Sequence, residues 1–339
     1  MGKKDVITKS FMSDRRHFAD AFNYHMFDGH QVIKADSLNP VDTAELGIVF
    51  ANDKSKYIQR IRDLLSECII MQDGEFLYVL LGVENESKIH YAMPVKEMIY
   101  DALDYAQQVS EIEKKHRENK DTKTSDEFLS GFTKDDRLKP VIPLTIYWGN
   151  EEWDAPRNLK EMFGNVDERI LKFVNDYKLN LILPNEIEDF RKFTSEFGKA
   201  MKYIAVSKDE EAYQKTTEDE YYRNISVETA RLLNECAGMK IQIEKKEEVV
   251  NMCKAWDDHE ARGIAKGKEI GIAEGKEIGE EIGKEIGDAR TLVDVIEKLQ
   301  KNMSCSLEKA LQAIGKNVAE YEKAKLLVEQ EEGRGSQHV

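Results

Sequence analysis

The chain has 339 residues, of which 65 are acidic and 50 are lysine or arginine, so its formal net charge at pH 7 is −15. This length allows one sizeable domain with an appendage, or two domains. The acidic balance argues against a broad electrostatic grip on nucleic acid or on an anionic membrane, but it does not exclude a local basic groove.

Cysteine usage and the N-terminus indicate the cell compartment. The four cysteines lie far apart and include no CxxC pair, which favours reduced thiols over a zinc site or a disulfide framework. The first residues, MGKKDVITKSFMSDRR, lack the apolar core of a signal peptide, and no apolar run is long enough to span a bilayer. The sequence therefore predicts a soluble, cytoplasmic protein with no membrane partner.

The first predicted element is a helix over residues 13–27, where apolar side chains recur at helical spacing. Asp20 and Asn23 lie on this helix, away from the centre of its apolar stripe. A short buried strand is expected at Leu46–Phe50. The following segment, Lys54–Arg62, is strongly basic for this chain, and it is either a solvated face or a phosphate contact.

A β-hairpin is the strongest local prediction. Two strand-like runs, Leu64–Met71 and Glu75–Val83, flank Gln72-Asp73-Gly74, and Asp-Gly between apolar runs is a strong hairpin signal. Folding this hairpin returns Asp63 to the neighbourhood of Glu84. Acidic residues therefore meet at the outer end of the strand pair.

Three carboxylates are expected at that end of the hairpin. Glu84 and Glu86 are two residues apart on one strand, so their side chains share a face, and Asp63 approaches them from the other strand. Such a cluster suits a hard divalent cation, most simply Mg²⁺ bridging Asp63 and Glu84 with help from the backbone carbonyl of Asn85. Spacing alone does not decide the matter, because acidic residues at hairpin ends are also common as solvated faces.

The middle of the chain continues with alternating helices and strands. A long helix is predicted from Val95 to about His116, followed by a polar loop over Glu118–Ser130. Core strands are expected at Leu138–Trp148 and Asn180–Leu183, and a further helix over Ile187–Ala205. This order predicts an α/β fold with a small mixed sheet flanked by helices. The polar residues on the long helix are expected to serve packing and solvation: Tyr100, Asp101 and Asp104.

The last third of the chain has a different character, with helices and no further sheet expected beyond Asp209. Glycine recurs every fourth residue from Gly263 to Gly287, and each glycine costs a helix up to about 1 kcal/mol relative to alanine. This segment is interpreted as a flexible or partner-stabilised helical linker, with self-association through close helix packing as the alternative. Amphipathic patterning returns over Thr291–Val328 and predicts a small helical module.

Three separated stretches carry a resemblance to a known family: FADAFNYHMFDGHQVIK, RIRDLLSECIIMQDGEFLYVLLGVENESKIHYAMPVKEMIYDALDY and KPVIPLTIYWGNEEWDAPRNL. In this order they resemble the PD-(D/E)XK nuclease family transposases, the Rpn (recombination-promoting nuclease)/YhgA-like group. The resemblance implies a restriction-endonuclease-like core and DNA cleavage dependent on Mg²⁺ or Mn²⁺. The domain boundaries that follow are 12–205 for the nuclease-like domain, 206–260 for a helical extension, 261–290 for the glycine-repeat linker, 291–328 for the helical module and 329–339 for a disordered tail.

The resemblance also implies roles for single residues. Asp63 matches the acid that opens the second core strand, and Glu84 matches the acid of the third strand. Glu86 stands where the wider fold has lysine and this group commonly has glutamine, and Asp20 lies where the fold often carries an auxiliary acid. A lysine would polarise the attacking water, whereas Glu86 adds negative charge, so it acts as a base, as an extra metal ligand or as the mark of a weakened activity. Lys88, on the same face, is a candidate for a migrated lysine.

The main interpretation is therefore a metal-dependent DNA endonuclease, a hydrolase of phosphodiester bonds associated with recombination or mobile elements, with DNA as its partner. A first alternative is a catalytically impaired protein that keeps the nuclease fold for DNA binding or self-assembly. A second alternative is an interaction adaptor that works through the repeat and tail. The C-terminal helical region is the candidate surface for a homo-oligomer.

Overall fold

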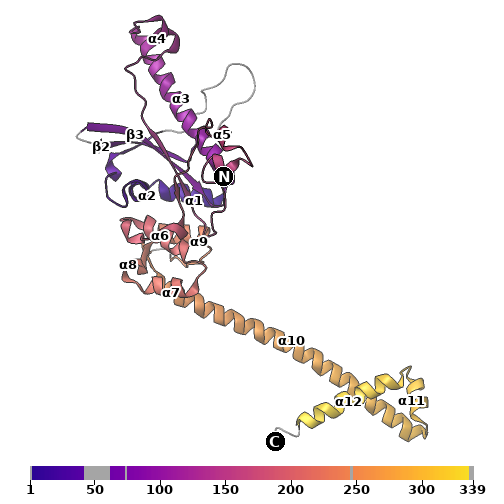
Figure 1. Cartoon of the computed structure of the whole chain (residues 1–339). Helices are drawn as coiled ribbons and strands as arrows, with labels where there is room; N and C mark the ends of the chain where they lie inside the picture. The colour runs from indigo at the N-terminus through magenta and orange to yellow at the C-terminus, as the bar shows by residue number, and fades with distance from the viewer. Residues whose placement is uncertain (1, 42–61, 73–74, 245–246, 336–339) are drawn as a thin grey trace. The chain divides into compact units, whose positions relative to one another are not determined.

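The computed structural model describes residues 2–41, 62–72, 75–244 and 247–335 (Figure 1). The chain divides into two compact units, Met1–His259 and Glu260–Val339, which are described separately. The predicted strand at Leu46–Phe50, the basic residues 54–60 and the turn at Asp73-Gly74 lie outside the described residues. Within the described part of the chain, no helix is long and apolar enough to cross a membrane.

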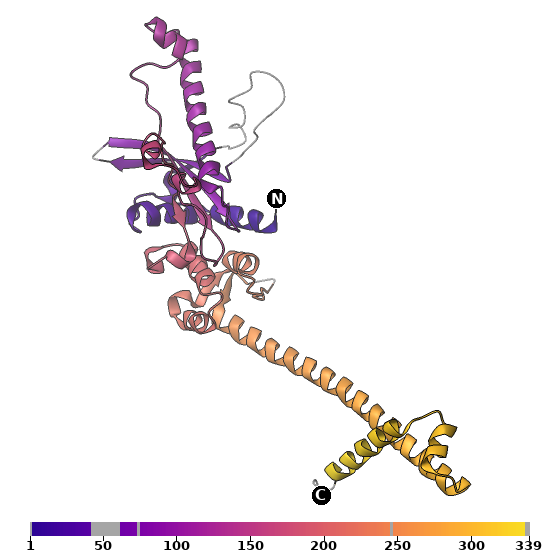
Figure 2. The same cartoon turned by 45° about the vertical axis from the view of Figure 1, so that its right-hand side comes forward.

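A five-stranded mixed sheet forms the centre of the first unit (Figure 2). The strand order is β1 (Leu38–Pro40), β2 (Leu64–Gln72), β3 (Glu75–Glu86), β4 (Val141–Tyr147) and β5 (Leu181–Ile182). Strand β2 pairs antiparallel with both β1 and β3, whereas β4 pairs parallel with both β3 and β5. The predicted α/β fold with a small mixed sheet and flanking helices is confirmed.

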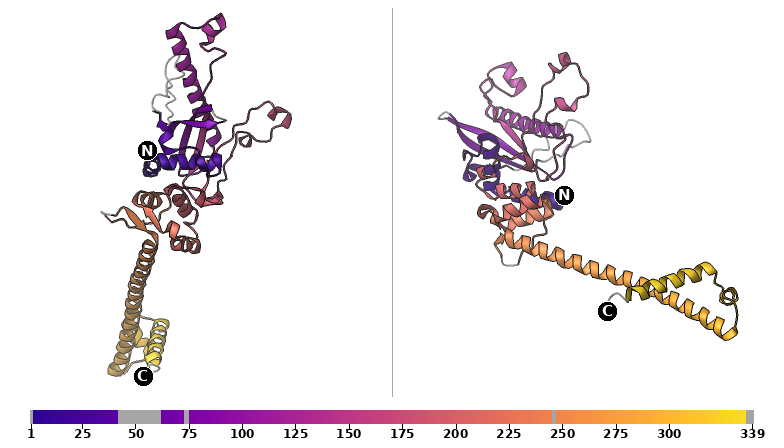
Figure 3. Two further views of the ribbon diagram at one scale, coloured as in Figure 1. Left: turned by 90° about the vertical axis from the view of Figure 1, so that its left-hand side faces the viewer. Right: turned by 60° about the horizontal axis from the view of Figure 1, so that its bottom comes forward.

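The large hydrophobic core covers one face of this sheet. Val79, Leu81 and Val83 alternate along β3 toward this core, as expected for side chains two apart on a strand. In Figure 3 the first two helices lie along this side of the sheet. The helices that contribute buried residues here include α1 (Lys3–Met12), α2 (Arg15–Phe27), α6 (Glu196–Ala205) and α9 (Val227–Cys236).

The other face of the sheet carries α3 (Met93–Asn119), the crossover between the parallel strands β3 and β4. Leu65, Leu80 and Val141 form a small cluster on this face, with Tyr105 of α3 packed against it. Strand alternation therefore places the even-numbered residues at the end of β3 on the same face as α3.

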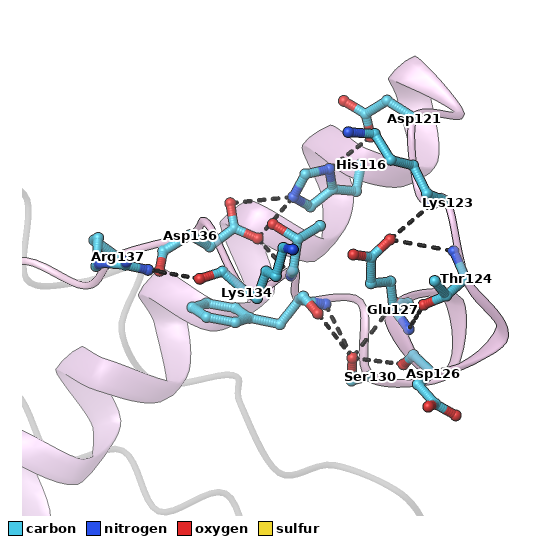
Figure 4. Close-up of polar contacts among 12 residues, drawn as sticks. His116, Asp121, Lys123, Thr124, Asp126, Glu127, Ser130, Lys134, Asp136 and Arg137 are labelled. Carbon is cyan, nitrogen blue, oxygen red and sulfur yellow. Dashed lines mark hydrogen bonds and ion pairs between the residues drawn. The ribbon is translucent and has the colours of Figure 1, made fainter.

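The distal end of α3 carries its own polar network (Figure 4). Helix α4 (Ser125–Ser130) forms within the segment predicted to be a loop, because Thr124 and Glu127 make a capping box. The ring of His116 bonds the carboxylates of Asp121 and Asp136 at 2.6 and 2.9 Å. These two hydrogen bonds raise the pKa of His116 and fasten the loop after α4 to the helix.

The segment after β4 is less regular than predicted. The helix expected over residues 187–205 is reduced to α6, because Phe190–Lys192 forms a 3₁₀ turn and Ser195 caps α6 by accepting from the N–H of Phe197. This segment also holds the short helices η3 (Lys160–Met162), α5 (Glu168–Leu171) and η4 (Pro184–Glu186), whereas η1 (Ala35–Ser37) precedes β1.

The region after α6 belongs to the same large core rather than to a separate body. It holds α7 (Glu210–Glu218), α8 (Glu220–Arg223), α9 and a second sheet, in which β6 (Asn224–Ser226) pairs antiparallel with β7 (Val249–Asn251). The expectation of no sheet beyond Asp209 is wrong. Strands of three residues are too short to show the alternation that identifies a strand in a sequence.

The second unit is helical. Its elements are the C-terminal part of α10 (Met252–Met303), α11 (Leu307–Ala313) and α12 (Val318–Gly335). Ile296 of α10 is buried with Leu311 and Tyr321 from the two following helices. Helix α12 continues beyond residue 328, into the segment predicted to be disordered, where an ion pair joins Arg290 to Glu331.

Candidate active site

Asp63 and Glu84 meet at the end of the β2–β3 pair. The N–H of Asp63 donates to Glu84 Oε1 at 3.0 Å, and the N–H of Asn85 donates to Asp63 Oδ2 at 3.0 Å. Each carboxylate is therefore fixed by a backbone N–H of the other strand. The antiparallel register explains this exchange, because Leu64 pairs with Val83 and the next residues face each other.

A lysine that the sequence did not single out completes the cluster. Lys96 lies in the first turn of α3, which follows directly after β3 and has Pro94 near its start. Its Nζ lies 2.8 Å from Glu84 Oε2 and 2.6 Å from Glu86 Oε1. One ammonium group thus bridges the two glutamates of the strand.

Burial makes the electrostatics of this cluster unusual. Glu84 is 2% exposed, and this burial raises its pKa to about 7, with Glu97 and Asp63 adding to the shift and Lys96 opposing it. Burial lowers the pKa of Lys96, but Glu84 and Glu86 outweigh that effect and the pKa is raised. Lys96 therefore keeps its charge at neutral pH, whereas Glu84 titrates there.

A second charge cluster lies beside the first, on the same face of the sheet. The guanidinium of Arg62, next to Asp63 in the chain, contacts Glu97 at 2.8 Å, Asp101 at 2.9 Å and Asp104 at 3.5 Å. Its side chain passes over Gly82, where a Cβ would lie only 2.5 Å from Arg62 Cδ. Glycine at this position thus leaves the space that the arginine occupies.

The Arg62 cluster is closed by two hydroxyl groups. Thr145 of β4 donates to Glu97 Oε1 at 2.8 Å, and Tyr177 donates to Asp101 Oδ2 at 2.6 Å. Burial is the main reason that the pKa of Asp101 and of Asp104 is raised to about 6. Of the two expected roles, packing and solvation, these aspartates show packing, because both belong to α3 and are buried around the guanidinium of Arg62.

Comparison with models of known protein families identifies the family of this chain. A family model described as "Putative transposase, YhgA-like" matches residues 3–219, more than half of the chain. The chain belongs to this YhgA-like transposase family. A search of curated proteins and a search of solved structures each returned no match.

Membership confirms the predicted resemblance to the YhgA-like group. The match covers the whole five-stranded sheet, both charge clusters, α1 and the extension as far as Asp219. It ends before the long helix α10, so the glycine repeat and the second unit lie outside the matched part.

Asp20 lies in a different network from the one around Asp63 in this family member. Its carboxylate accepts from the N–H of Thr194 at 2.9 Å, and from the N–H and hydroxyl of Ser195 at 2.8 and 2.7 Å. Since Ser195 caps α6, Asp20 fastens α2 to the start of that helix. Its assignment as an auxiliary acid stays a prediction.

The side-chain oxygens at the end of the β2–β3 pair determine which metal ion could bind there. Among the residues that the structure describes, no group of three or more His, Cys, Asp or Glu side chains is arranged to hold a metal ion. Asp63 and Glu84 nevertheless present hard oxygen donors of the kind that Mg²⁺ and Mn²⁺ take, and an ammonium already lies against Glu84. Asp63 and Glu84 therefore match a divalent cation in the chemistry of their donors, and their role as metal ligands stays a prediction. Glu86 and the carbonyl of Asn85 stay predicted ligands.

Proposed function

We propose that the chain is a metal-dependent DNA endonuclease that acts in recombination or in a mobile element. The observation that carries this proposal is the exchange of backbone hydrogen bonds between Asp63 and Glu84, with Lys96 bound against Glu84. Membership of a transposase family supports DNA as the substrate. Asp63 and Glu84 would hold Mg²⁺ or Mn²⁺, which would offset charge on the phosphodiester and activate a water molecule.

Lys96 supplies the positive charge that strand position 86 lacks. In the fold that the sequence resembles, a lysine two residues after the second acid polarises the attacking water. Here the ammonium of Lys96 arrives from α3 and lies between Glu84 and Glu86. It can stabilise negative charge on a phosphodiester beside Glu84 without standing on the strand.

Glu86 then has a positioning role. Its carboxylate lies 2.6 Å from Lys96 Nζ and fixes the long lysine side chain beside Glu84. The residue that looked like a sign of lost activity becomes part of the support for the lysine. Under this proposal the chain is an active enzyme, and the alternative of an impaired nuclease fold is decided by the cleavage assay.

A plasmid-nicking assay with Mg²⁺ or Mn²⁺ tests the proposal. Asp63→Asn, Glu84→Gln and Lys96→Met are each expected to lower the rate about 10²-fold or more, as for the loss of one preorganised charge in an active site. Glu67→Gln removes a carboxylate from the same strand pair, where Glu67 is half-buried and paired with Lys139, and it should keep the wild-type rate. No cleavage by the wild type, or equal cleavage by the wild type and all three site variants, would contradict the proposal.

A second proposal, self-association, is favoured by an uncovered stripe on α10. Gly275, Ile282, Ala289 and Ile296 recur every seven residues and share one face of the helix. Ala289 and Ile296 are buried within the second unit, whereas Ile282 is 51% exposed. The stripe continues toward the N-terminus of the helix through further positions seven residues apart: Ile264, Gly271 and Ile278.

A second copy of the chain, antiparallel to the first, fits this stripe. Gly271 and Gly275 allow two helices to approach closely at a crossing point. With the crossing there, Lys268 of each copy lies opposite Ile278 of the other and one turn from Glu281, so the charges are complementary. Burial of the isoleucines would also offset the helix cost of the glycines.

Mass measurement of the full chain in solution tests this second proposal. Replacing Ile278 and Ile282 together by lysine should convert a dimer to a monomer, because the lysine at position 278 would face Lys268 of the other copy and the lysine at position 282 would place a charge against its apolar stripe. Ile270→Lys is the matched control, since Ile270 is similarly exposed but lies about 120° around the helix from Ile282. A monomeric wild type, or a control that dissociates equally, would reject the stripe as the interface.

A further inference from the structure

A pocket of about 250 Å³ opens beside Asp63, on the side of β2 away from β3. The corner between α1 and α2 forms one wall, and β1 with the start of β2 forms the other. Asp63 itself lines this pocket, so the pocket reaches the predicted metal ligand. Its position makes it the approach to the candidate active site from the edge of the sheet.

Two cations line this pocket without partners of their own. Lys9, in the last turn of α1, and Arg15, at the start of α2, both border it. Within the part of the chain that the structure describes, neither side chain forms an ion pair or hydrogen bond. Asp14, which precedes Arg15 in the chain, is instead engaged by Arg16 at 2.6 Å. Two free positive charges therefore face one carboxylate, in a chain of net charge −15.

The walls of the pocket are firm and largely apolar. Met12, Phe18 and Leu38 belong to the large core and are almost fully buried, so their positions are set by packing. Leu65 is buried on the other face of the sheet. The hydroxyl groups of Ser13 and Ser66 add polar edges. The backbone positions of Lys9 and Arg15 are thus set by a packed corner beside Asp63.

We infer that this pocket binds one backbone phosphate of the DNA strand, with its sugar, next to the phosphodiester that is cut. The inference rests on the proposed endonuclease function and names the residues that hold its substrate, Lys9 and Arg15. The volume lies below the roughly 300–1,000 Å³ of typical ligand pockets, so it suits one nucleotide of a strand and not a duplex groove. Lysine and arginine are the residues that bind backbone phosphates, and such contacts set register without reading sequence.

This arrangement also answers the problem of charge at the site. A phosphodiester approaching Asp63 and Glu84 meets two carboxylates, and the whole chain is acidic. Lys9 and Arg15 offset that repulsion locally, while the remaining surface stays unfavourable for DNA. The result is a short basic corner that can hold one strand, in place of the broad basic face that the composition excludes.

The experiment measures binding of a fluorescein-labelled single-stranded DNA by anisotropy, with EDTA present, as a function of salt concentration. Lys9→Gln and Arg15→Gln should each weaken binding several-fold and lower the slope of log K against log salt by about 0.7, the value for one contact to a single strand. The double variant should lower the slope by about 1.4. Because no metal and no cleavage are involved, failure of the endonuclease proposal leaves this readout intact.

Controls separate the pocket from general electrostatics. Lys172→Gln removes the same charge from an exposed residue that does not line the pocket, and it should leave affinity and slope unchanged. Equal losses in Lys172→Gln, or wild-type slopes in the double variant, would overturn the inference. An RNA strand of the same sequence that binds more tightly, with the same dependence on Lys9 and Arg15, would overturn the assignment to DNA. Normal cleavage with an unchanged slope would reject the pocket alone and leave the endonuclease proposal standing.

Discussion

Two charge clusters start from neighbouring residues of α3 and differ in almost every physical respect. Lys96 bridges Glu84 and Glu86 at the end of β3, and its side chain is 20% exposed. Glu97, the next residue, takes part in a cluster around Arg62, whose side chain is 1% exposed. Both clusters put one cation against several carboxylates, on the same face of one sheet.

The difference in exposure between the two cations separates a structural cluster, around Arg62, from the candidate active site, around Lys96. A guanidinium presents five donors in a fixed fork and can bind several carboxylates at once, so Arg62 joins the residues before β2 to α3. An ammonium is a single point charge on a flexible stem, and a partly exposed one can be displaced by a stronger cation. The buried arginine therefore holds the elements in place, and the lysine occupies the place where chemistry is expected.

The largest expected effect, on the free energy of unfolding, comes from removing the arginine of the scaffold cluster around Arg62. Arg62→Met leaves buried carboxylates at positions 97, 101 and 104 without their cation, and it should lower the free energy of unfolding by about 3–5 kcal/mol. Urea unfolding followed by tryptophan fluorescence measures this, because all three tryptophans lie in the first unit. Arg157→Met is the control, since its pair with Glu186 is about half exposed and should contribute less than about 1 kcal/mol. Equal losses in the two variants would remove the distinction between the clusters.

A smaller effect is expected at the candidate active site, where one substitution should raise metal affinity and lower the rate of DNA cleavage. Lys96→Met removes the cation that competes for Glu84, so Mn²⁺ should bind about tenfold more tightly, equivalent to 1.4 kcal/mol, while DNA cleavage falls. Isothermal titration calorimetry measures the binding without any turnover.

Lys88→Met is the matched control for this experiment. Lys88 is exposed and lies two residues after Glu86, where the sequence offered a migrated lysine. It should change neither Mn²⁺ binding nor cleavage. Weaker binding of Mn²⁺ by Lys96→Met would show that the lysine supports the ion instead of competing with it.

The sequence predicted the parts of the site that depend on local pattern. The hairpin and the meeting of Asp63 with Glu84 followed from two strands and a tight turn, and the register confirms them. Lys96 was missed because its role depends on where α3 begins relative to the end of β3. The only signal available was a lysine in the first turn of a helix that starts at a proline soon after the strand.

The scaffold cluster could not be found by periodicity at all. Arg62 and Glu97 are 35 residues apart, and their contact requires the Arg62 side chain to pass over Gly82, which has no side chain of its own. The aspartates at positions 101 and 104 fall on the polar side of the helix pattern, which normally marks a solvated face. Only the tertiary placement of α3 shows that this polar side is turned toward a buried arginine.

The smallest expected effect concerns pH, and its sign follows from burial. The pKa of Glu84 is about 7 in the folded chain against an ordinary value of 4.5, so the folded chain holds a proton that the unfolded chain has released. Stability should therefore fall as pH rises from 4.5 to 7. Asp101 and Asp104, whose pKa values are raised to about 6, act in the same direction at lower pH. Between pH 6 and 7 Glu84 acts together with His116, whose raised pKa also makes stability fall as pH rises, so a variant is needed to separate the two.

Glu84→Gln isolates that contribution. The variant cannot ionise, so its free energy of unfolding should lose less between pH 6 and 7 than that of the wild type, while the slope below pH 6 persists. Urea unfolding at closely spaced pH values measures both slopes, and Glu67→Gln controls for the loss of a carboxylate from the same strand pair. If Glu84→Gln keeps the full wild-type slope above pH 6, then the buried glutamate is already ionised beside Lys96. The partly exposed cluster would in that case be as permanent an ion pair as the one around Arg62.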